Sequence, residues 1–216
     1  MYLRQGKINE ALSFYSHATH CHEAVNATYQ LGNDYSGLGQ IYMEQNRLIE
    51  AESAHQKALQ FHKIANALFE QGNDYSMLAR LYMRLNKHED ALAANEKALE
   101  LYKLVNSTLG QGDVHKQFGD IYYSQGKINE AESSYRKALE VYTRAKSAYG
   151  QVQALTELGY IYMQKGQPYD AKEMFEKATD FHKKAQNVSY ARQNAEYLSA
   201  VITQIKEGGS IEGSTK

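Results

Sequence analysis

The chain has 216 residues, of which 43% are hydrophobic and 23% are charged, a composition typical of a folded, water-soluble protein. Lys and Arg total 24 and Asp and Glu total 25, which argues against nucleic acid or an anionic membrane as the partner. The N-terminal sequence lacks the apolar core of a signal peptide, and no apolar run approaches the ~20 residues that span a bilayer. The lone Cys21 excludes an internal disulfide. We therefore expect a cytoplasmic protein.

The sequence repeats itself every 40 residues without insertions. Three ladders of identical residues make the period visible: Tyr2, Tyr42, Tyr82, Tyr122 and Tyr162; Ala11, Ala51, Ala91, Ala131 and Ala171; and Ala18, Ala58, Ala98, Ala138 and Ala178. A strict period of this length predicts a stacked-repeat array, because one unit cannot bury its apolar face without a neighbour.

Apolar residues within each repeat follow helical spacing, broken once by a turn, so each repeat is predicted to be an antiparallel helix hairpin. The first helices of the hairpins, the A helices, are predicted over residues 27–45, 67–85, 107–125, 147–165 and 188–206. The second helices, the B helices, are predicted over residues 8–25, 48–65, 88–105, 128–145 and 168–185.

Short polar residues and glycines mark the predicted helix ends. Gly6, Asn46, Asn86, Gly126 and Gly166 are expected to end the A helices in the left-handed conformation. Asn26, Asn66, Asn106, Ser147 and Asn187 are expected to cap the start of the A helices. The predicted domain order is a partial N-terminal repeat over 1–26, four hairpins over 27–191, a capping segment over 192–206 and a disordered tail over 207–216.

The repeats resemble the tetratricopeptide repeat (TPR). The resemblance rests on Leu38-Gly39-x-x-Tyr42, Phe118-Gly119-x-x-Tyr122 and Leu158-Gly159-x-x-Tyr162, each followed by a turn and the ladder alanines. The 40-residue period resembles the arrays of Pins-type adaptors, kinesin light chains and bacterial Rap regulators. The resemblance implies an all-α, right-handed superhelical solenoid of antiparallel helix hairpins that binds proteins. The chain departs from the family at the tryptophan position, which holds Tyr35, Tyr75, His115 and Leu155.

In such arrays the A helices line a concave groove. The stripe of each A helix opposite the tyrosine ladder is therefore the candidate surface for a protein or peptide partner. The candidate residues are Gln40, Met43, Asn73, Arg80, Met83, Arg84, Lys116, Asp120, Tyr123, Tyr160 and Met163. Two interpretations of Met43, Met83, Tyr123 and Met163 stay open: an adaptable binding ladder, or core packing between neighbouring A helices.

His17, His20 and Cys21 form a weak candidate metal site on one helical face. Comparison with equivalent repeat positions predicts that Cys21 points inward and His17 outward, which argues against a metal. No catalytic motif is present, so no enzymatic activity and no cofactor is predicted.

Two function hypotheses follow. The first is a non-catalytic interaction scaffold that binds a peptide or helix in the concave groove. The second is a structural spacer or self-association segment of a larger protein, acting through an uncapped N-terminal flank formed by Leu12, Tyr15 and Thr19.

Overall fold

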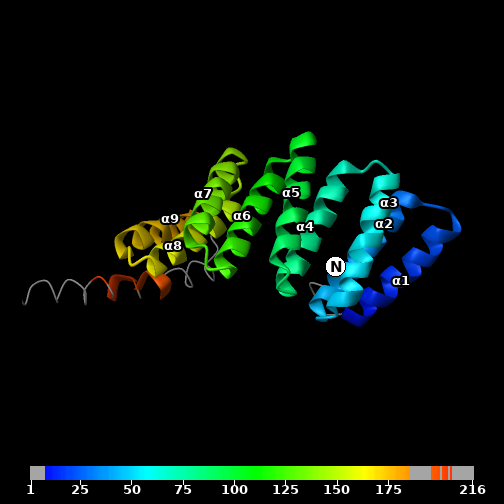
Figure 1. Cartoon of the computed structure of the whole chain (residues 1–216), viewed down its shortest axis with the longest axis horizontal. Coiled ribbons are helices and arrows are strands. Elements are labelled where there is room, and N and C mark those ends of the chain that lie inside the picture. Colours follow the sequence, from blue (N-terminus) through cyan, green and yellow to red (C-terminus); the bar gives the residue numbers. More distant parts are fainter. Residues whose placement is uncertain (1–7, 185–195, 200, 204, 206–216) are drawn as a thin grey trace, which may run out of the picture. The chain divides into compact units, whose positions relative to one another are not determined.

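The computed structural model describes residues 8–184, 196–199, 201–203 and 205, and this part of the chain is all-α (Figure 1). The helices are α1 (Ile8–Ala24), α2 (Thr28–Glu44), α3 (Leu48–Ile64), α4 (Leu68–Arg84), α5 (His88–Leu104), α6 (Thr108–Ser124), α7 (Ile128–Arg144), α8 (Ala148–Gln164) and α9 (Pro168–Lys184). Each predicted helix in this range is present, with ends that differ by about a residue. Within the described residues, no helix is long and apolar enough to cross a membrane.

The backbone has a shorter period than the sequence. Each of these helices is 17 residues long, and one begins every 20 residues from residue 8 to residue 168. A residue with positive φ follows each of α1 to α8: Asn26, Asn46, Asn66, Asn86, Asn106, Gly126, Lys146 and Gly166. Asparagine and glycine tolerate this left-handed conformation best. The turns inside hairpins and the turns between hairpins are therefore built alike.

This finding confirms the predicted turn residues Asn46, Asn86, Gly126 and Gly166, and it corrects the predicted caps. Asn26, Asn66 and Asn106 do not cap the A helices, because they lie one residue earlier and end the preceding B helices with φ of 54–55°. The cap positions of α2 and α4 hold Ala27 and Ala67, which make no capping hydrogen bond, whereas Ser107 accepts a hydrogen bond from the Gly110 amide at 3.3 Å at the start of α6. The Ser147 hydroxyl accepts a hydrogen bond from the Gly150 amide at 3.2 Å, as predicted for Ser147. The predicted roles of Gly6 and Asn187 lie outside the described residues.

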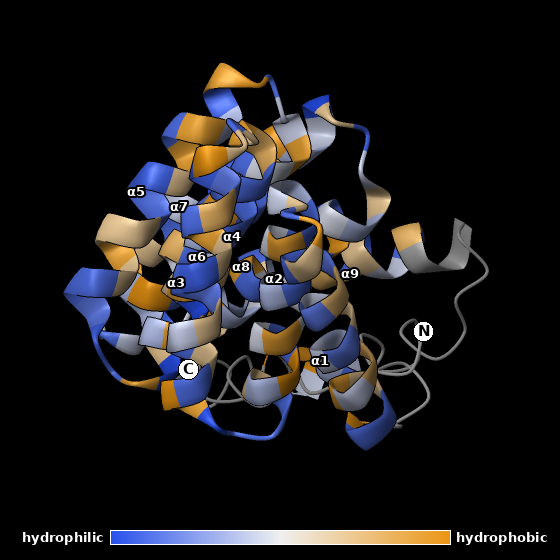
Figure 2. Ribbon diagram, turned by 90° about the vertical axis from the view of Figure 1, so that its right-hand side faces the viewer, coloured by the Kyte–Doolittle hydropathy of each residue, from blue (hydrophilic) through white to orange (hydrophobic). Residues whose placement is uncertain are grey.

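The chain divides into two compact units, and the first comprises Met1–Gly110. In this unit α2 pairs with α3 and α4 pairs with α5, while α1 packs on α2 and α3 packs on α4. The ladder alanines of α3 and α5 are completely buried, and Leu81 of α4 packs in one core cluster with Ala51. Apolar and polar residues alternate along each ribbon in Figure 2, as expected of helices with one buried face.

The second unit comprises Gln111–Lys216. Here α7 packs on α8 and α8 packs on α9. Its largest core cluster contains Tyr135, Leu158 and Phe175, each at most 2% exposed. Val201, in the predicted capping segment, is 1% exposed and joins the same cluster, with Leu198 packed against it. The C-terminal segment thus contributes apolar side chains to the core of this unit.

Candidate partner-binding surface

A pocket of about 220 Å³ lies in the first unit, where side chains of α2 and α4 face each other. Its lining residues are Gln40, Met43 and Glu44 from α2 and Met77, Arg80 and Arg84 from α4. Gln40, Met43, Arg80 and Arg84 are among the residues predicted to line the groove, so the fold brings this part of the predicted set together. Two guanidinium groups and one carboxylate give the lining a net charge of +1.

Arg84 forms one wall of the pocket and is fixed by the backbone of the neighbouring A helix. Its guanidinium donates hydrogen bonds to the Met43 carbonyl at 2.6 Å and to Asn46 Oδ1 at 2.9 Å. The carbonyl belongs to the last turn of α2, where the helix dipole is negative and favours a cation. Arg84 therefore joins α4 to the C-terminal end of α2.

Arg80 lies one turn earlier on α4 and is exposed. Its Nη1 is 3.6 Å from the Met77 sulfur, a contact that leaves the positive charge without an anionic partner. Ion pairs in the described part of the chain involve neither Arg80 nor Arg84. The Arg80 guanidinium is thus available to an external anion.

His55 of α3 is a buried ionisable residue that interacts electrostatically with Arg80. It is completely buried, neither ring nitrogen has a hydrogen-bond partner, and a Cβ built on Gly39 would lie 2.6 Å from Nε2. Burial, together with the positive charge of Arg80, lowers the pKa of His55 to about 4. The imidazole is therefore neutral at neutral pH and adds no positive charge beneath the pocket.

The residues of the methionine and tyrosine ladder differ in how exposed they are. Met43 is 9% exposed and packs in a core cluster with Ala51 and Leu81, and its remaining exposed surface lines the pocket. Met83 is half-buried. Asn73, another predicted groove residue of this unit, lies away from the pocket lining and accepts a hydrogen bond from the Tyr102 hydroxyl at 2.6 Å.

In the second unit, the positive charge of Lys116 on the predicted groove face is neutralised by an ion pair. Lys116 donates to Asp120 at 2.9 Å, and Asp120 also accepts a hydrogen bond from the Tyr135 hydroxyl at 2.8 Å. The half-buried Glu157 lies near this pair. Its pKa is raised by burial and by the charge of Asp120, against the opposing charge of Lys116.

The apolar members of the second stripe also differ from one another. Tyr160 packs edge-to-face on Phe175 and Tyr197 at 5.6 and 5.1 Å between ring centroids, so its ring is part of the core. Met163 is half-buried against the same cluster. Tyr123 is 42% exposed and is the ladder member most open to a partner.

Sequence reasoning missed two histidine–aspartate pairs, of which one is buried and the other is partly exposed. His62 Nδ1 lies 2.6 Å from Asp74 Oδ2, and the same atoms of His22 and Asp34 are also 2.6 Å apart. Ser36 donates to the other oxygen of Asp74 at 2.8 Å, so the buried pair connects α2, α3 and α4. Burial raises the pKa of Asp74 to about 6, although the hydrogen bond from His62 opposes the shift.

The repeats contain a signal for these pairs. Histidine at positions 22 and 62 accompanies aspartate at positions 34 and 74. Where tyrosine replaces the histidine, at Tyr102 and Tyr142, the residue 12 positions later is Val114 or Ala154. Aspartate therefore follows histidine at two of these positions, whereas His182 is followed 12 positions later by Asn194.

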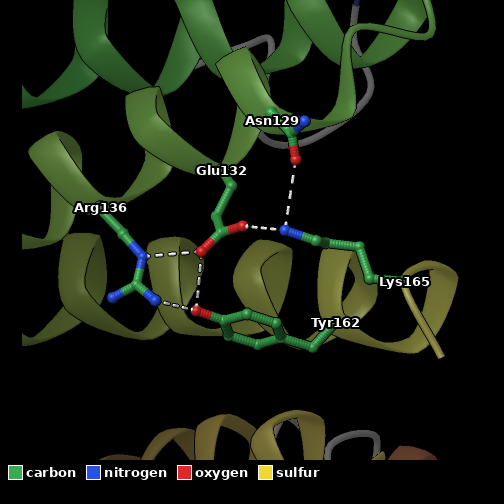
Figure 3. A network of polar contacts seen from close by, with 5 residues as sticks. All are labelled: Asn129, Glu132, Arg136, Tyr162 and Lys165. Carbon is green, nitrogen blue, oxygen red and sulfur yellow. Dashed lines mark hydrogen bonds and ion pairs between the residues drawn. The ribbon is translucent and has the colours of Figure 1, made fainter. Parts of the chain in front are cut away.

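A polar network on the second unit ties α7 to α8 (Figure 3). The Glu132 carboxylate accepts hydrogen bonds from Arg136 Nε at 2.9 Å, the Tyr162 hydroxyl at 3.1 Å and Lys165 Nζ at 2.7 Å. Burial alone would raise the pKa of Glu132, but the hydrogen bonds from Lys165, Arg136 and Tyr162 lower it overall. The charged groups of this network pair with one another, which fits a structural role.

The weak metal candidate at the N-terminus is not assembled. Cys21 is exposed, in contrast to the inward position predicted from Phe61, and its sulfur is 3.9 Å from His17 Nε2. His20 is also exposed. Among the described residues, no group of three or more His, Cys, Asp or Glu side chains has the geometry to hold a metal ion.

The predicted N-terminal flank is largely turned into the first unit. Thr19 is 8% exposed, and Tyr15 is half-buried against Gly37 of α2. Leu12 is half-buried. The large apolar side chain that α1 exposes is instead Phe14, which is 59% exposed.

Three models described as tetratricopeptide repeat match the chain, over residues 35–66, 75–144 and 152–181. These matches together include parts of both units. No curated protein sequence matches the chain closely enough to identify a relative.

Many solved structures share the fold. Aspartyl phosphate phosphatase F from Bacillus subtilis has a TM-score of 0.84 and 17% identity, with 97% of this chain and 56% of that chain covered. BtubC from P. vanneervenii has a TM-score of 0.70 and 17% identity, with 97% and 93% covered. A Rap protein complexed with competence and sporulation factor has a TM-score of 0.78 and 17% identity, with 95% and 61% covered. At these identities the likeness is one of fold.

Proposed function

The chain belongs to the tetratricopeptide repeat family, and from that premise we propose that it is a non-catalytic interaction scaffold that binds a protein segment, a peptide or a helix, on the exposed face of its A helices. The fold supports a protein-interaction role. The location of the binding surface and the absence of catalysis are our inference. We extend the proposal to a cytoplasmic protein that has no cofactor and does not bind nucleic acid or membranes.

The observation that carries the proposal is the pocket between α2 and α4. Four of its six lining residues belong to the predicted groove set, and two of those, Gln40 and Arg80, are exposed. Concave sites with a few convergent polar groups are where proteins bind ligands. One structural neighbour, a Rap protein, has been solved in complex with competence and sporulation factor, so the fold supports binding in that protein.

The test is site-specific photo-crosslinking with the full chain in a lysate of the source cells. One variant carries a photoreactive amino acid in place of Gln40, on the A-helix face. The matched control carries it in place of Gln60, an exposed glutamine on the B helix α3. We expect adducts to a partner from the Gln40 position and none of the same adducts from the Gln60 position.

Equal adducts from both positions, or adducts only from Gln60, would contradict binding on the A-helix face. Circular dichroism of each variant has to show wild-type helix content, so that the comparison reports binding rather than folding. The adduct masses identify the partner, and the crosslinked peptide identifies the segment that contacts α2.

The alternative function, self-association of the array, rests on Phe14. This side chain is 59% exposed in the middle of α1, and an exposed aromatic residue is a common contact between copies. We expect Phe14→Glu to abolish any mass increase seen with rising concentration in analytical ultracentrifugation. A wild-type chain that stays monomeric at all concentrations would remove this alternative.

A further inference from the structure

We propose that the α2–α4 pocket selects partners by an acidic side chain that lies beside an apolar one, with Arg80 as the group that recognises the carboxylate. This inference rests on the proposed function and adds the chemistry of the ligand. It follows from the charge, the contacts and the apolar surface of the pocket.

The charge available to a ligand comes from Arg80. Of the two guanidinium groups in the pocket, that of Arg84 is already occupied by the Met43 carbonyl and the Asn46 amide oxygen. Within the described part of the chain, the one hydrogen bond of the exposed Arg80 guanidinium goes to the Met77 sulfur, a weak acceptor. A planar guanidinium with open donors binds a carboxylate through two parallel hydrogen bonds.

The apolar part of the pocket comes from methionine. Met77 is half-buried beside Arg80, and Met43 is 9% exposed at the opposite side of the lining. Flexible thioether side chains adapt to apolar groups of different shape. A leucine, methionine or phenylalanine next to the acidic residue would therefore cover these side chains while the carboxylate reaches Arg80.

Among the A helices that the structure describes in full, α2, α6 and α8 do not repeat this arrangement. The positions equivalent to Arg80 hold Gln40, Asp120 and Tyr160. Asp120 already pairs with Lys116, and Tyr160 packs in the core of the second unit. Recognition of an acidic group is thus assigned to one helix, α4, and is a property of this chain rather than of the repeat pattern.

Glu44 is the one acidic residue of the pocket and supplies an internal control. It is exposed on α2, within the same lining, and forms no ion pair with either arginine in the described structure. Its charge opposes an incoming carboxylate. Removal of this charge is therefore expected to strengthen the binding that removal of Arg80 weakens.

The experiment pans a phage-displayed library of random dodecapeptides against the full chain, in parallel with Arg80→Glu and with Glu44→Gln. Both substituted residues are exposed, so thermal unfolding is expected to stay close to wild type and is measured first. Peptides enriched on the wild type are then synthesised, and their dissociation constants are measured for all three proteins.

We expect wild-type peptides to be enriched in Asp or Glu adjacent to Leu, Met or Phe. Their binding is expected to weaken by about tenfold or more on Arg80→Glu, since a hydrogen bond between charged groups is lost and repulsion replaces it. Binding to Glu44→Gln is expected to strengthen by roughly two- to fivefold. The Arg80→Glu protein is expected to select Lys or Arg at the same place.

Enriched peptides without an acidic residue, or with equal affinity for the wild type and Arg80→Glu, would overturn this inference and leave the proposed interaction function in place. Failure of all three proteins to enrich any peptide would overturn the inference together with peptide binding by this face. The crosslinking from Gln40 then decides whether a folded partner surface binds there.

Discussion

At the scale of single residues, two buried histidines occupy positions where several other repeats have an aromatic side chain. His55 takes the place of Tyr135 and Phe175, and His62 takes the place of Tyr102 and Tyr142. Each ring lies against a glycine of an A helix. The small glycine lets the ring approach the helix backbone, and the ring in turn excludes any larger residue at the glycine position.

Gly32 tests this close approach. A Cβ at this position would lie 2.4 Å from the His62 ring, which is held by Asp74. In an open helix position, Gly→Ala would stabilise by about 1 kcal/mol. We expect Gly32→Ala to lower the free energy of unfolding by about 1–3 kcal/mol instead, because the buried ring has to move. Urea denaturation measures the change.

Gly126 is the matched control for Gly32. It has positive φ and no atom within 4 Å of a built Cβ, so Gly126→Asn keeps a residue that tolerates this backbone. A change of only a few tenths of a kcal/mol is expected there. A stabilised Gly32→Ala protein would show that the ring has room to shift.

The pKa of His55 reports the position of the Arg80 charge. Burial lowers this pKa first, and Arg80 lowers it further. Arg80→Gln removes only the second contribution, so we expect the pKa to rise while staying below that of an exposed histidine. An NMR titration of the imidazole carbon-bound protons measures it. An unchanged pKa would mean that the guanidinium lies away from the ring.

At the scale of helices and hairpins, side chains rather than capping residues hold neighbouring elements in register. Arg84 joins α4 to the last turn of α2, and Tyr82 joins α4 to α3 through a 3.1 Å hydrogen bond to Glu52. In the second unit, the equivalent Tyr162 hydroxyl donates a hydrogen bond to Glu132 at 3.1 Å. The tyrosine ladder therefore has a polar end as well as an apolar ring.

The hydrogen bonds around Glu132 allow the stabilisation from polar contacts between neighbouring helices to be measured. We expect Glu132→Gln to lower the free energy of unfolding by about 1–2 kcal/mol at pH 7, because Arg136 and Lys165 lose their anionic acceptor. The pKa of Glu132 is lower in the folded chain than its ordinary value. The stabilisation is thus present above the unfolded pKa and is lost as pH falls through the folded pKa.

The difference between wild type and Glu132→Gln should therefore shrink when urea denaturation is repeated at low pH. Glu176→Gln is the control, because its contact with Lys172 spans 3.7 Å and both side chains are 41–52% exposed. Such pairs contribute little. A pH-independent difference between wild type and Glu132→Gln would assign its effect to packing.

At the scale of the whole molecule, stability in a repeat array is expected to be local, because each helix packs mainly on its neighbours in sequence. We expect Gly32→Ala to speed amide hydrogen exchange in α1 to α4 and to leave α7 to α9 unchanged. Mass-spectrometric hydrogen exchange of the full chain measures this. A uniform rise across all helices would show one cooperative unfolding unit instead.

Much of the fold could be predicted from the sequence because the period, the ladder alanines and the glycines each express a packing constraint. Helix ends were predicted to within about a residue. The caps were predicted less well, because Asn26, Asn66 and Asn106 suit both a helix start and a left-handed helix end, and only backbone angles separate these roles.

The candidate surface could be predicted only in part. Gln40, Arg80 and Arg84 were assigned to the groove by helical periodicity, which gives the face of a residue but not its depth. Met43 therefore could not be separated from core packing, since its burial depends on contact with Leu81 in another hairpin. Fixation of Arg84 by a carbonyl of α2 likewise depends on tertiary contacts.

The uniform left-handed turn has a consequence for how the gene can change. Each of α1 to α8 is followed by the same backbone bend, so a coding segment copied from one turn to the equivalent turn of the next repeat rejoins in a conformation already used at that junction. A copy of one 40-residue repeat adds a complete hairpin with its alanines in place. Relatives of this chain are therefore expected to differ by whole hairpins while keeping helix length constant.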